Sequence, residues 1–401
     1  MAVHIRKAAA KLKRYHHFMS SIRAPLVKML QDLIKIESIN PSLAATGSGE
    51  QGVALFLEQY CKEKGLPYEF QEVADGRANF VTWRTGRDPD KRVLFVAHMD
   101  TVPIDKWETD PFSGEEHSGR VHGRGSCDDK ASLAAMLTAL STLGDSQPAT
   151  TIVVVASIDE EFRKIGARAI AQSGVTYDAA VVGEPTDLEL VVAHKGSVRW
   201  QLEVQGVPAH TSKPYLGVNA ITGMAKIVLA IDKLNAVLAK QDDPLVGPPA
   251  ITVSLIEGGI ELTTVPPVCR IWIDRRLKPG DSPQQAIQEV EDIVNTFRSG
   301  EDQIRVCSLL PAWEDPAPNS AEGTKIAEVA SRACANVAGT GKYIGAPWGT
   351  DASQLSLAGI PCVVIGPGSV DQAHTSNEFV DIEQTVKAVE IYRQIMIEYE
   401  P

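Results

Sequence analysis

The chain has 401 residues, of which 44% are hydrophobic and 22% charged, and its formal net charge is −12. These fractions are ordinary for a folded protein and exclude a disordered chain, a collagen and a small disulfide-stapled protein. No apolar run reaches the roughly 18 residues that a membrane helix needs. So acidic a protein is a poor partner for nucleic acid or for an anionic membrane. At about 150 residues per domain, the length predicts two or three domains.

Two further features concern the compartment. None of the six cysteines forms a C-x-x-C pair or another zinc-finger spacing, which predicts free or buried thiols in a reducing cytoplasm. The first 30 residues carry several basic side chains and no acidic one, as in a transit peptide. We favour instead an exposed helix face or a start codon placed too early.

Short apolar runs rich in β-branched residues predict buried strands, and helical patterns separate them. The runs are Val93–Ala97, Ile152–Ala156, Ala179–Val182 and Cys362–Ile365. Apolar residues at helical spacing predict helices at 26–33 and 133–143. This alternation indicates an α/β fold built on a mostly parallel sheet.

The pattern changes between residues 195 and 308. Strands with one polar face are predicted at 198–205, Ile251–Ile256, Cys269–Arg275 and Gln303–Leu309. Helices are predicted at 221–234 and after Asp281-Ser282-Pro283, and a loop is predicted at 236–250. The order β-α-β-β-α-β is the split βαβ pattern of ferredoxin-like domains. We therefore predict that residues 195–308 form an inserted α+β domain within a larger domain made of residues 1–194 and 309–401.

Polar residues collect where the predicted parallel strands end, which is where open α/β sheets bind ligands. They are His98 and Asp100 after the first run, Asp159-Glu160-Glu161 after the second, Glu184 after the third, His374 after the fourth, and Asp128-Asp129 before a helix. Clustered carboxylates repel one another unless a cation offsets their charge. Two histidines with three or four carboxylates suit a pair of zinc ions, with one carboxylate left as a general base. Such a centre can hydrolyse amides.

These motifs, together with Gly123-Arg124-Gly125, resemble in order those of the M20 family of metallopeptidases and deacylases. That family includes acetylornithine deacetylase, succinyl-diaminopimelate desuccinylase, aminoacylase and the glutamate carboxypeptidases. The resemblance extends from about residue 25 to residue 385. The segments Gly366–His374 and Trp107–Phe112 are most similar to the acetylornithine deacetylase group.

The resemblance implies two zinc ions per subunit, with Co²⁺ or Mn²⁺ as alternatives. Their ligands would be His98 and Glu184 for one ion, Glu161 and His374 for the other, and Asp128 between the two. The Asp-x-Lys spacing favours Asp128 over Asp129 as the bridge. Members of the family hold the peptide bond after this aspartate in cis, so a cis bond is expected here.

The resemblance also implies roles for residues that hold no metal. Glu160 would be the general base, and Asp100 would support a histidine ligand. The inserted domain would be a lid and dimerisation domain in which His210 reaches an active site, often that of the partner subunit, to stabilise the oxyanion. Arg276 would bind a substrate carboxylate through its bidentate fork, near the backbone amide of Gly368.

Two positions in the inserted domain qualify these roles. Arg275 could compete with Arg276, and strand alternation predicts that the two side chains lie on opposite faces. After Gly258-Gly259 the family usually has an asparagine that contacts the substrate, whereas Thr263 stands here. Threonine is shorter and has no amide, so the resemblance leaves open both how this chain contacts its substrate and whether the substrate is the usual acyl amino acid.

Together these features predict a cytoplasmic, homodimeric zinc hydrolase that cleaves the amide of an N-acyl amino acid, as an acetylornithine deacetylase does. The alternatives are a dipeptide or glutamate carboxypeptidase, a succinyl-diaminopimelate desuccinylase, and a non-catalytic protein that binds metal or amino acids. The last alternative predicts loss of the base or of a ligand, and all these positions are filled. The expected partners are a small substrate and a second copy of the chain, not nucleic acid or membrane.

Overall fold

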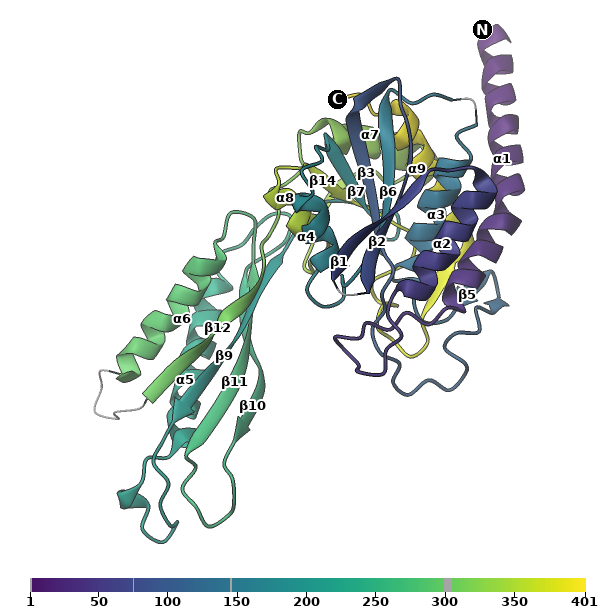
Figure 1. Ribbon diagram of the computed structural model, residues 1–401. Helices are drawn as coiled ribbons and strands as arrows, with labels where there is room; N and C mark the ends of the chain where they lie inside the picture. Colours follow the sequence, from purple (N-terminus) through teal and green to yellow (C-terminus); the bar gives the residue numbers. More distant parts are fainter. Residues whose placement is uncertain (1, 75, 145, 299–304) are drawn as a thin grey trace. The chain divides into compact units, whose positions relative to one another are not determined.

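The computed structural model describes residues 2–74, 76–144, 146–298 and 305–401, with side chains from residue 17 onward except at 311 and 312. The chain divides into two compact units (Figure 1). The first unit holds residues 1–192, 321–344 and 350–401, and the second holds residues 193–320 and 345–349. None of the described helices is both long and apolar enough to cross a bilayer.

An eight-stranded sheet, in the order β1-β2-β6-β3-β7-β14-β8-β13, forms the core of the first unit. Its central strands are parallel neighbours: β6 (Thr150–Ser157), β3 (Asp88–His98), β7 (Ala179–Val182) and β14 (Cys362–Val364). The outer strands are β1 (Tyr68–Ala74) and β2 (Arg77–Arg84) on one side and β8 (Leu190–His194) and β13 (Tyr343–Ala346) on the other. The four predicted apolar runs are thus the four central strands, and the predicted α/β class is confirmed.

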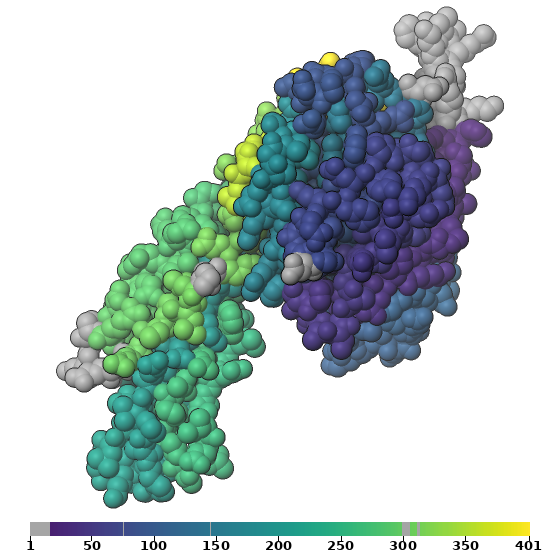
Figure 2. Space-filling view, in the orientation of Figure 1, coloured from purple at the N-terminus to yellow at the C-terminus, as the bar shows by residue number. Residues whose placement is uncertain are grey.

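Helices cover both faces of this sheet, which is why β3 from Val93 onward and all of β6 are buried. One face carries α2 (Gln51–Lys64), α3 (Lys130–Ser141), α7 (Lys325–Val337) and α9 (Ile382–Glu398), with α1 (Ala2–Ile34) against α3 and α9. The other face carries α4 (Ile165–Gln172) and α8 (Ala352–Leu357). From residue 17 onward α1 lies at the surface of this unit, in purple (Figure 2).

A small second sheet lies beside the N-terminus of α9. It consists of β15 (Phe379–Asp381), β5 (Arg120–His122) and β4 (Glu116–His117). Strands β4 and β5 form a hairpin whose turn residues, Ser118 and Gly119, both have positive φ. Strand β15 therefore brings the C-terminal part of the chain next to the loop that follows β5.

The second unit is built in the predicted order β-α-β-β-α-β. Its elements are β9 (Gly196–Gln205), the short 3₁₀ helix Pro214–Leu216, α5 (Ala220–Leu238), β10 (Ala250–Gly258), β11 (Val268–Leu277), α6 (Pro283–Arg298) and β12 (Arg305–Asp315). The strands form an antiparallel sheet in the order β10-β11-β9-β12. Both helices pack on one face, around the fully buried Trp200.

Local predictions in the second unit need some correction. Helix α6 begins at Pro283 as expected, and Ser282 Oγ accepts a hydrogen bond from the amide of Gln285. The predicted loop at 236–250 starts too early, because α5 continues through Leu238. Of the strand predicted at Gln303–Leu309, residues 303 and 304 lie outside the described residues, and the strand itself continues to Asp315.

Candidate active site

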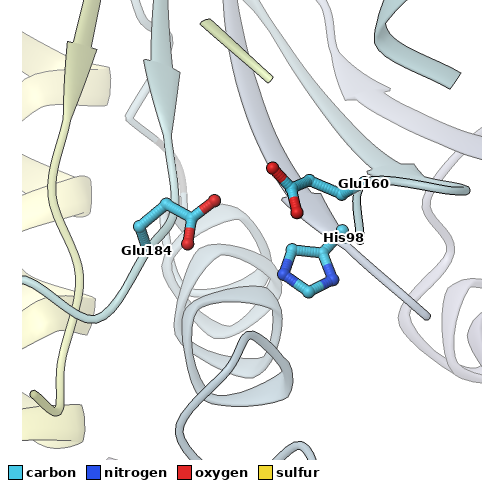
Figure 3. A group of neighbouring side chains, drawn as sticks. All are labelled: His98, Glu160 and Glu184. Atoms are coloured by element: carbon cyan, nitrogen blue, oxygen red, sulfur yellow. The ribbon is translucent and has the colours of Figure 1, made fainter. Parts of the chain in front are cut away.

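Polar side chains gather at the carboxyl ends of the central parallel strands. His98 ends β3, Glu160 and Glu161 follow β6, and Glu184 follows β7. The strand register places His98 opposite Ser157, so the strands end at the same edge of the sheet. Figure 3 shows His98, Glu160 and Glu184 pointing toward one another across this edge.

Asp128 lies between the two histidines that the sequence singled out. His98 Nε2 is 2.9 Å from Asp128 Oδ1, and His374 Nε2 is 3.4 Å from Asp128 Oδ2. His374 Nε2 is also 3.0 Å from Glu161 Oε2. Asp129 makes none of these contacts, and the Asp128–Asp129 peptide bond is cis, as expected.

The candidate metal ligands form two groups that share His98. One group is His98, Glu160 and Glu184, and the other is His98, Asp128 and Glu161. Within each group, one ligand atom from every residue lies within 4.8 Å of the others. The structure therefore brings all five predicted ligands and the predicted base into one cluster, with Glu160 beside Glu184 rather than apart from the ligands.

The electrostatics of this cluster are those of a cation site. Burial above all, then the nearby carboxylates Glu160 and Asp128, raises the pKa of the Glu184 carboxyl well above its usual value. Burial and the charge of Asp128 also raise the pKa of Glu161. Hydrogen bonds with Asp128 and Glu161 raise the pKa of His374 to about 10. The crowded carboxylates thus favour positive charge among them.

The side chains present fit divalent metal ions. Two imidazoles and three or more carboxylates are the donors that zinc and similar first-row metals take in proteins. Burial above all raises the pKa values of the Glu161 and Glu184 carboxyl groups, and repulsion from the Asp128 carboxylate raises both further. A metal ion would offset that repulsion directly and favour their ionised forms.

Asp100 supports the site by a route that differs from the predicted one. The backbone carbonyl of Asp100, at 2.9 Å, contacts His98 Nδ1, while its carboxylate lies 3.7 Å from that atom. The carboxylate accepts instead from the amides of Glu160, at 3.1 Å, and Glu161, at 3.2 Å. Asn40 Nδ2 adds a third hydrogen bond of 2.8 Å. Asp100 therefore fixes the backbone that presents the predicted base, Glu160, and a predicted ligand, Glu161.

Glu160 has polar neighbours that the sequence did not indicate. Lys164 Nζ is 3.1 Å from Glu160 Oε1 and 3.2 Å from the Glu160 carbonyl oxygen. The buried Asp351 accepts a 2.6 Å hydrogen bond from Ser157 Oγ. Burial first, and the charge of Glu160 second, raise the pKa of Asp351 to about 7. Glu160 therefore pairs with a cation, Lys164, and its charge also acts on the carboxyl group of Asp351.

Other supporting residues come from segments far from the motifs. Arg77 contacts Asp159 Oδ1 at 3.1 Å and also pairs with Glu50, whose carboxylate accepts the Asp159 amide. Glu378 accepts hydrogen bonds from the loop that precedes Asp128. No spacing rule identifies these residues. The one available signal was a charged residue, Glu378, close after His374.

Three residues of the second unit, His210, Thr263 and Arg276, are predicted to contact the substrate. The loops of His210 and Thr263 are neighbours, because the amide of Thr211 donates to the Thr263 carbonyl at 2.9 Å. His210 and Thr263 are both exposed. Arg276 pairs with Asp274 at 2.8 Å on the open face of β11. Arg275 is buried on the opposite face against Glu289 of α6, as strand alternation predicts.

Gly368 belongs to the first unit, in the turn after β14. Its φ of 86° is one that glycine adopts readily, and a Cβ there would lie 2.4 Å from Cys127 Sγ. Its amide donates to Gln384 Oε1 at 2.8 Å. A substrate carboxylate could take this amide only by displacing Gln384, so the binding role stays a prediction.

Comparison with known proteins agrees with this geometry. Residues 94–398 match the model of peptidase family M20/M25/M40. The chain is 28% identical over 377 residues to an acetylornithine deacetylase of Proteus mirabilis, with 90% of this chain and 94% of that protein covered.

Solved structures share the fold. The aminopeptidase PepT of Bacillus cereus superposes with a TM-score of 0.76 at 22% identity, covering 94% of this chain and 98% of that one. The Bacillus subtilis YXEP protein, described as a dinuclear metal-binding peptidase of the M20 family, gives 0.70 at 16% identity, covering 94% and 98%. The family match covers most of the chain, which therefore belongs to peptidase family M20/M25/M40 and is a metal-dependent hydrolase of amide bonds.

Proposed function

We propose that this hydrolase uses two zinc ions to remove the acyl group from an N-acyl amino acid, as an acetylornithine deacetylase does. One observation carries the proposal: two histidines and three carboxylates converge around Glu160 at one edge of the sheet. The substrate class is supported by the acetylornithine deacetylase that matches along 90% of the chain. At 28% identity the acyl group and side chain of the substrate need direct measurement.

The predicted ligands would hold the ions, with Asp128 between them because it contacts both histidines. Bound there, two cations would lower the pKa of a water molecule and polarise the amide carbonyl. Glu160 would take a proton from the attacking water and deliver it to the leaving amine. Lys164 would hold the Glu160 carboxylate, and Asp100 its backbone, in position for both transfers.

We further propose that the second unit contributes to substrate binding and to dimer formation. His210 would stabilise the oxyanion, and Arg276 would bind the substrate carboxylate in place of Asp274. Thr263, whose loop adjoins that of His210, would contact the substrate through a hydroxyl group. The asparagine that the family usually has at this position offers a side-chain amide instead. The difference predicts altered preference among acyl amino acids.

The test measures release of free amine from N-acetylornithine, other N-acetyl amino acids, N-succinyl-diaminopimelate and short dipeptides. Each substrate is incubated with the zinc-loaded enzyme, with the chelated enzyme and with Glu160→Gln. The variant removes the proton acceptor but keeps the shape of the side chain. We expect turnover of N-acyl amino acids that needs zinc and falls at least 100-fold in the variant.

The control is Glu63→Gln, at an exposed position on α2, which leaves turnover unchanged. Turnover of dipeptides alone would replace the deacylase proposal by a peptidase one. Full activity of Glu160→Gln would contradict the assigned base, and a chain that binds no metal would contradict the whole mechanism.

A further inference from the structure

The loop between β5 and α3 presents Asp128 and has no regular secondary structure. Its backbone amides converge on a single residue, Glu378. The amide of Gly125 donates to Glu378 Oε2 at 3.0 Å, and those of Cys127 and Asp128 donate to Oε1 at 2.8 and 3.0 Å. The amide of Gly123 donates to the Glu378 carbonyl at 3.0 Å. Four of the loop's amides therefore depend on one residue.

Arg124 completes this arrangement. Its Nη1 lies 2.6 Å from Glu378 Oε2, so each carboxylate oxygen accepts two hydrogen bonds. Arg124 and Glu378 are 2% and 1% exposed. Successive amides that point to one spot form a nest for an anion, and here a buried side chain of the same chain fills it. A buried carboxylate is stable only when it is paired and hydrogen-bonded in this way.

We propose that Glu378 is a positioning residue that sets the affinity of the site for metal. This inference rests on the metal centre proposed above. It holds the backbone amide of Asp128, whose carboxylate lies between the two histidines. It also follows His374 by four residues, in the segment that supplies that ligand. Glu378 thereby links Asp128 to His374, which comes from a segment much later in the sequence.

A carboxylate is required in this place. Both oxygens of Glu378 face N–H donors, so a glutamine would turn its own NH₂ group toward at least two of them. The loop would move to relieve this conflict, and Asp128 would move with it. Residues that orient metal ligands typically change metal affinity by 10- to 100-fold when they are substituted.

The experiment compares Glu378→Gln with Glu383→Gln, a matched change at a 70% exposed side chain five residues further on. Zinc affinity is measured on the metal-free chains by competition with a chromophoric chelator, and thermal unfolding is measured on the same samples. We expect Glu378→Gln to raise the zinc dissociation constant about 10- to 100-fold. At saturating zinc, kcat falls while KM stays constant. Glu383→Gln loses only an exposed ion pair with Arg23, so its zinc affinity, kcat and KM match those of the wild type.

A purely structural role predicts a different result. Glu378→Gln would then lower the unfolding temperature of the metal-free chain and leave the zinc dissociation constant unchanged, which would overturn the proposal. If the glutamine variant does not fold, Glu378→Asp keeps the charge but is one methylene too short to reach both sides of the loop. It must weaken zinc binding in the same direction, and unchanged affinity refutes the proposal.

The result is separable from that of the proposed function. Tight zinc binding by the wild type, weakened in Glu378→Gln, supports the positioning role even if no N-acyl amino acid is hydrolysed. Normal turnover with equal zinc affinity in all variants supports the function and overturns the positioning role. A wild-type chain that binds no zinc or other divalent metal overturns both.

Discussion

Asp100 is fully buried, and its two carboxylate oxygens accept three hydrogen bonds between them. Two of the donors are the amides of Glu160 and Glu161, one on each oxygen. The positions of Glu160 and Glu161 therefore depend on a buried residue. Removing the charge of Asp100 should cost more stability than removing a charge at the surface, because no water can replace the lost hydrogen-bond acceptor.

We predict that Asp100→Asn lowers kcat/KM roughly 10- to 100-fold. Whichever way the asparagine is turned, its NH₂ group faces an amide donor of Glu160 or Glu161. The unpaired donor also lowers the free energy of unfolding by about 1–3 kcal/mol. Steady-state kinetics and urea unfolding measure the two effects. The control is Asp105→Asn, at an 83% exposed side chain, and equal effects in both variants would contradict the prediction.

At the residue scale, the clustering of the strand-end residues could be predicted, and apart from Asp100 the residues that support them could not. His98 and Glu184 lie within two residues of the ends of apolar runs, and Glu161 lies five residues after one, so residue type and strand end indicated the cluster, whereas the M20 resemblance implied the ligand roles. Asn40 and Glu378 contribute through hydrogen bonds that exist only after distant segments meet. A polar side chain that serves a backbone amide carries no spacing pattern in the sequence.

Helix α9 links the core of the first unit to the turn that contains Gly368. Its N-cap is Asp381, whose carboxylate accepts from the amides of Glu383 and Gln384 at 2.9 and 3.1 Å. Gln384 then accepts the amide of Gly368. Further along, Tyr392 donates its hydroxyl to the Ile365 carbonyl at 2.7 Å. The helix is thereby fixed to both ends of the segment that follows β14.

We predict that Asp381→Ala lowers the free energy of unfolding by about 1 kcal/mol, because the two capped amides lose their acceptor. Asp381→Ser retains a capping oxygen and should lose less than half of that amount. Urea unfolding followed by circular dichroism measures both. Hydrogen exchange at Glu383 and Gln384 should quicken in the alanine variant alone. Unchanged exchange there would show that the cap does not hold the first turn.

Strand burial explains which elements could be predicted. The central strands β3, β6, β7 and β14 are covered on both faces and read as continuous apolar runs. Strand β1 is half exposed and mixes Glu and Gln with aromatic residues, so it gave no such signal. Strand β12 continues past Pro311, although proline has no amide hydrogen to donate to a neighbouring strand. An edge strand tolerates this, and the register of β12 against β9 shifts after Leu309.

The second unit exposes apolar side chains along the free edge of its sheet. Leu255 and Ile256 of the edge strand β10 are 60% and 58% exposed, and Leu229 of the adjoining α5 is 64% exposed. Leu262, in the loop after β10, is 99% exposed. An unpaired edge with neighbouring apolar residues is typical of an interface, since it would otherwise invite aggregation.

We predict that the protein is a homodimer and that Leu229→Glu combined with Leu255→Glu makes it a monomer. Two buried carboxylates without partners are too costly for an interface of standard size. Light scattering after size-exclusion chromatography gives the mass at micromolar concentration. Leu357→Glu, at a 66% exposed position of α8, should remain dimeric. A monomeric wild type would refute the prediction.

Strand β14 stands between β7 and β8 in the sheet, although β7 and β8 are consecutive in the chain. At about 5–20 residues per second, a ribosome makes β14 roughly 10–30 seconds after β8. During that interval the facing edges of β7 and β8 have no partner, and the nascent chain lacks His374 and Glu378. Translation that stops before β14 thus yields a fragment with an open sheet that lacks one proposed metal ligand, and the hydrolase becomes competent only after His374 and Glu378 have been made.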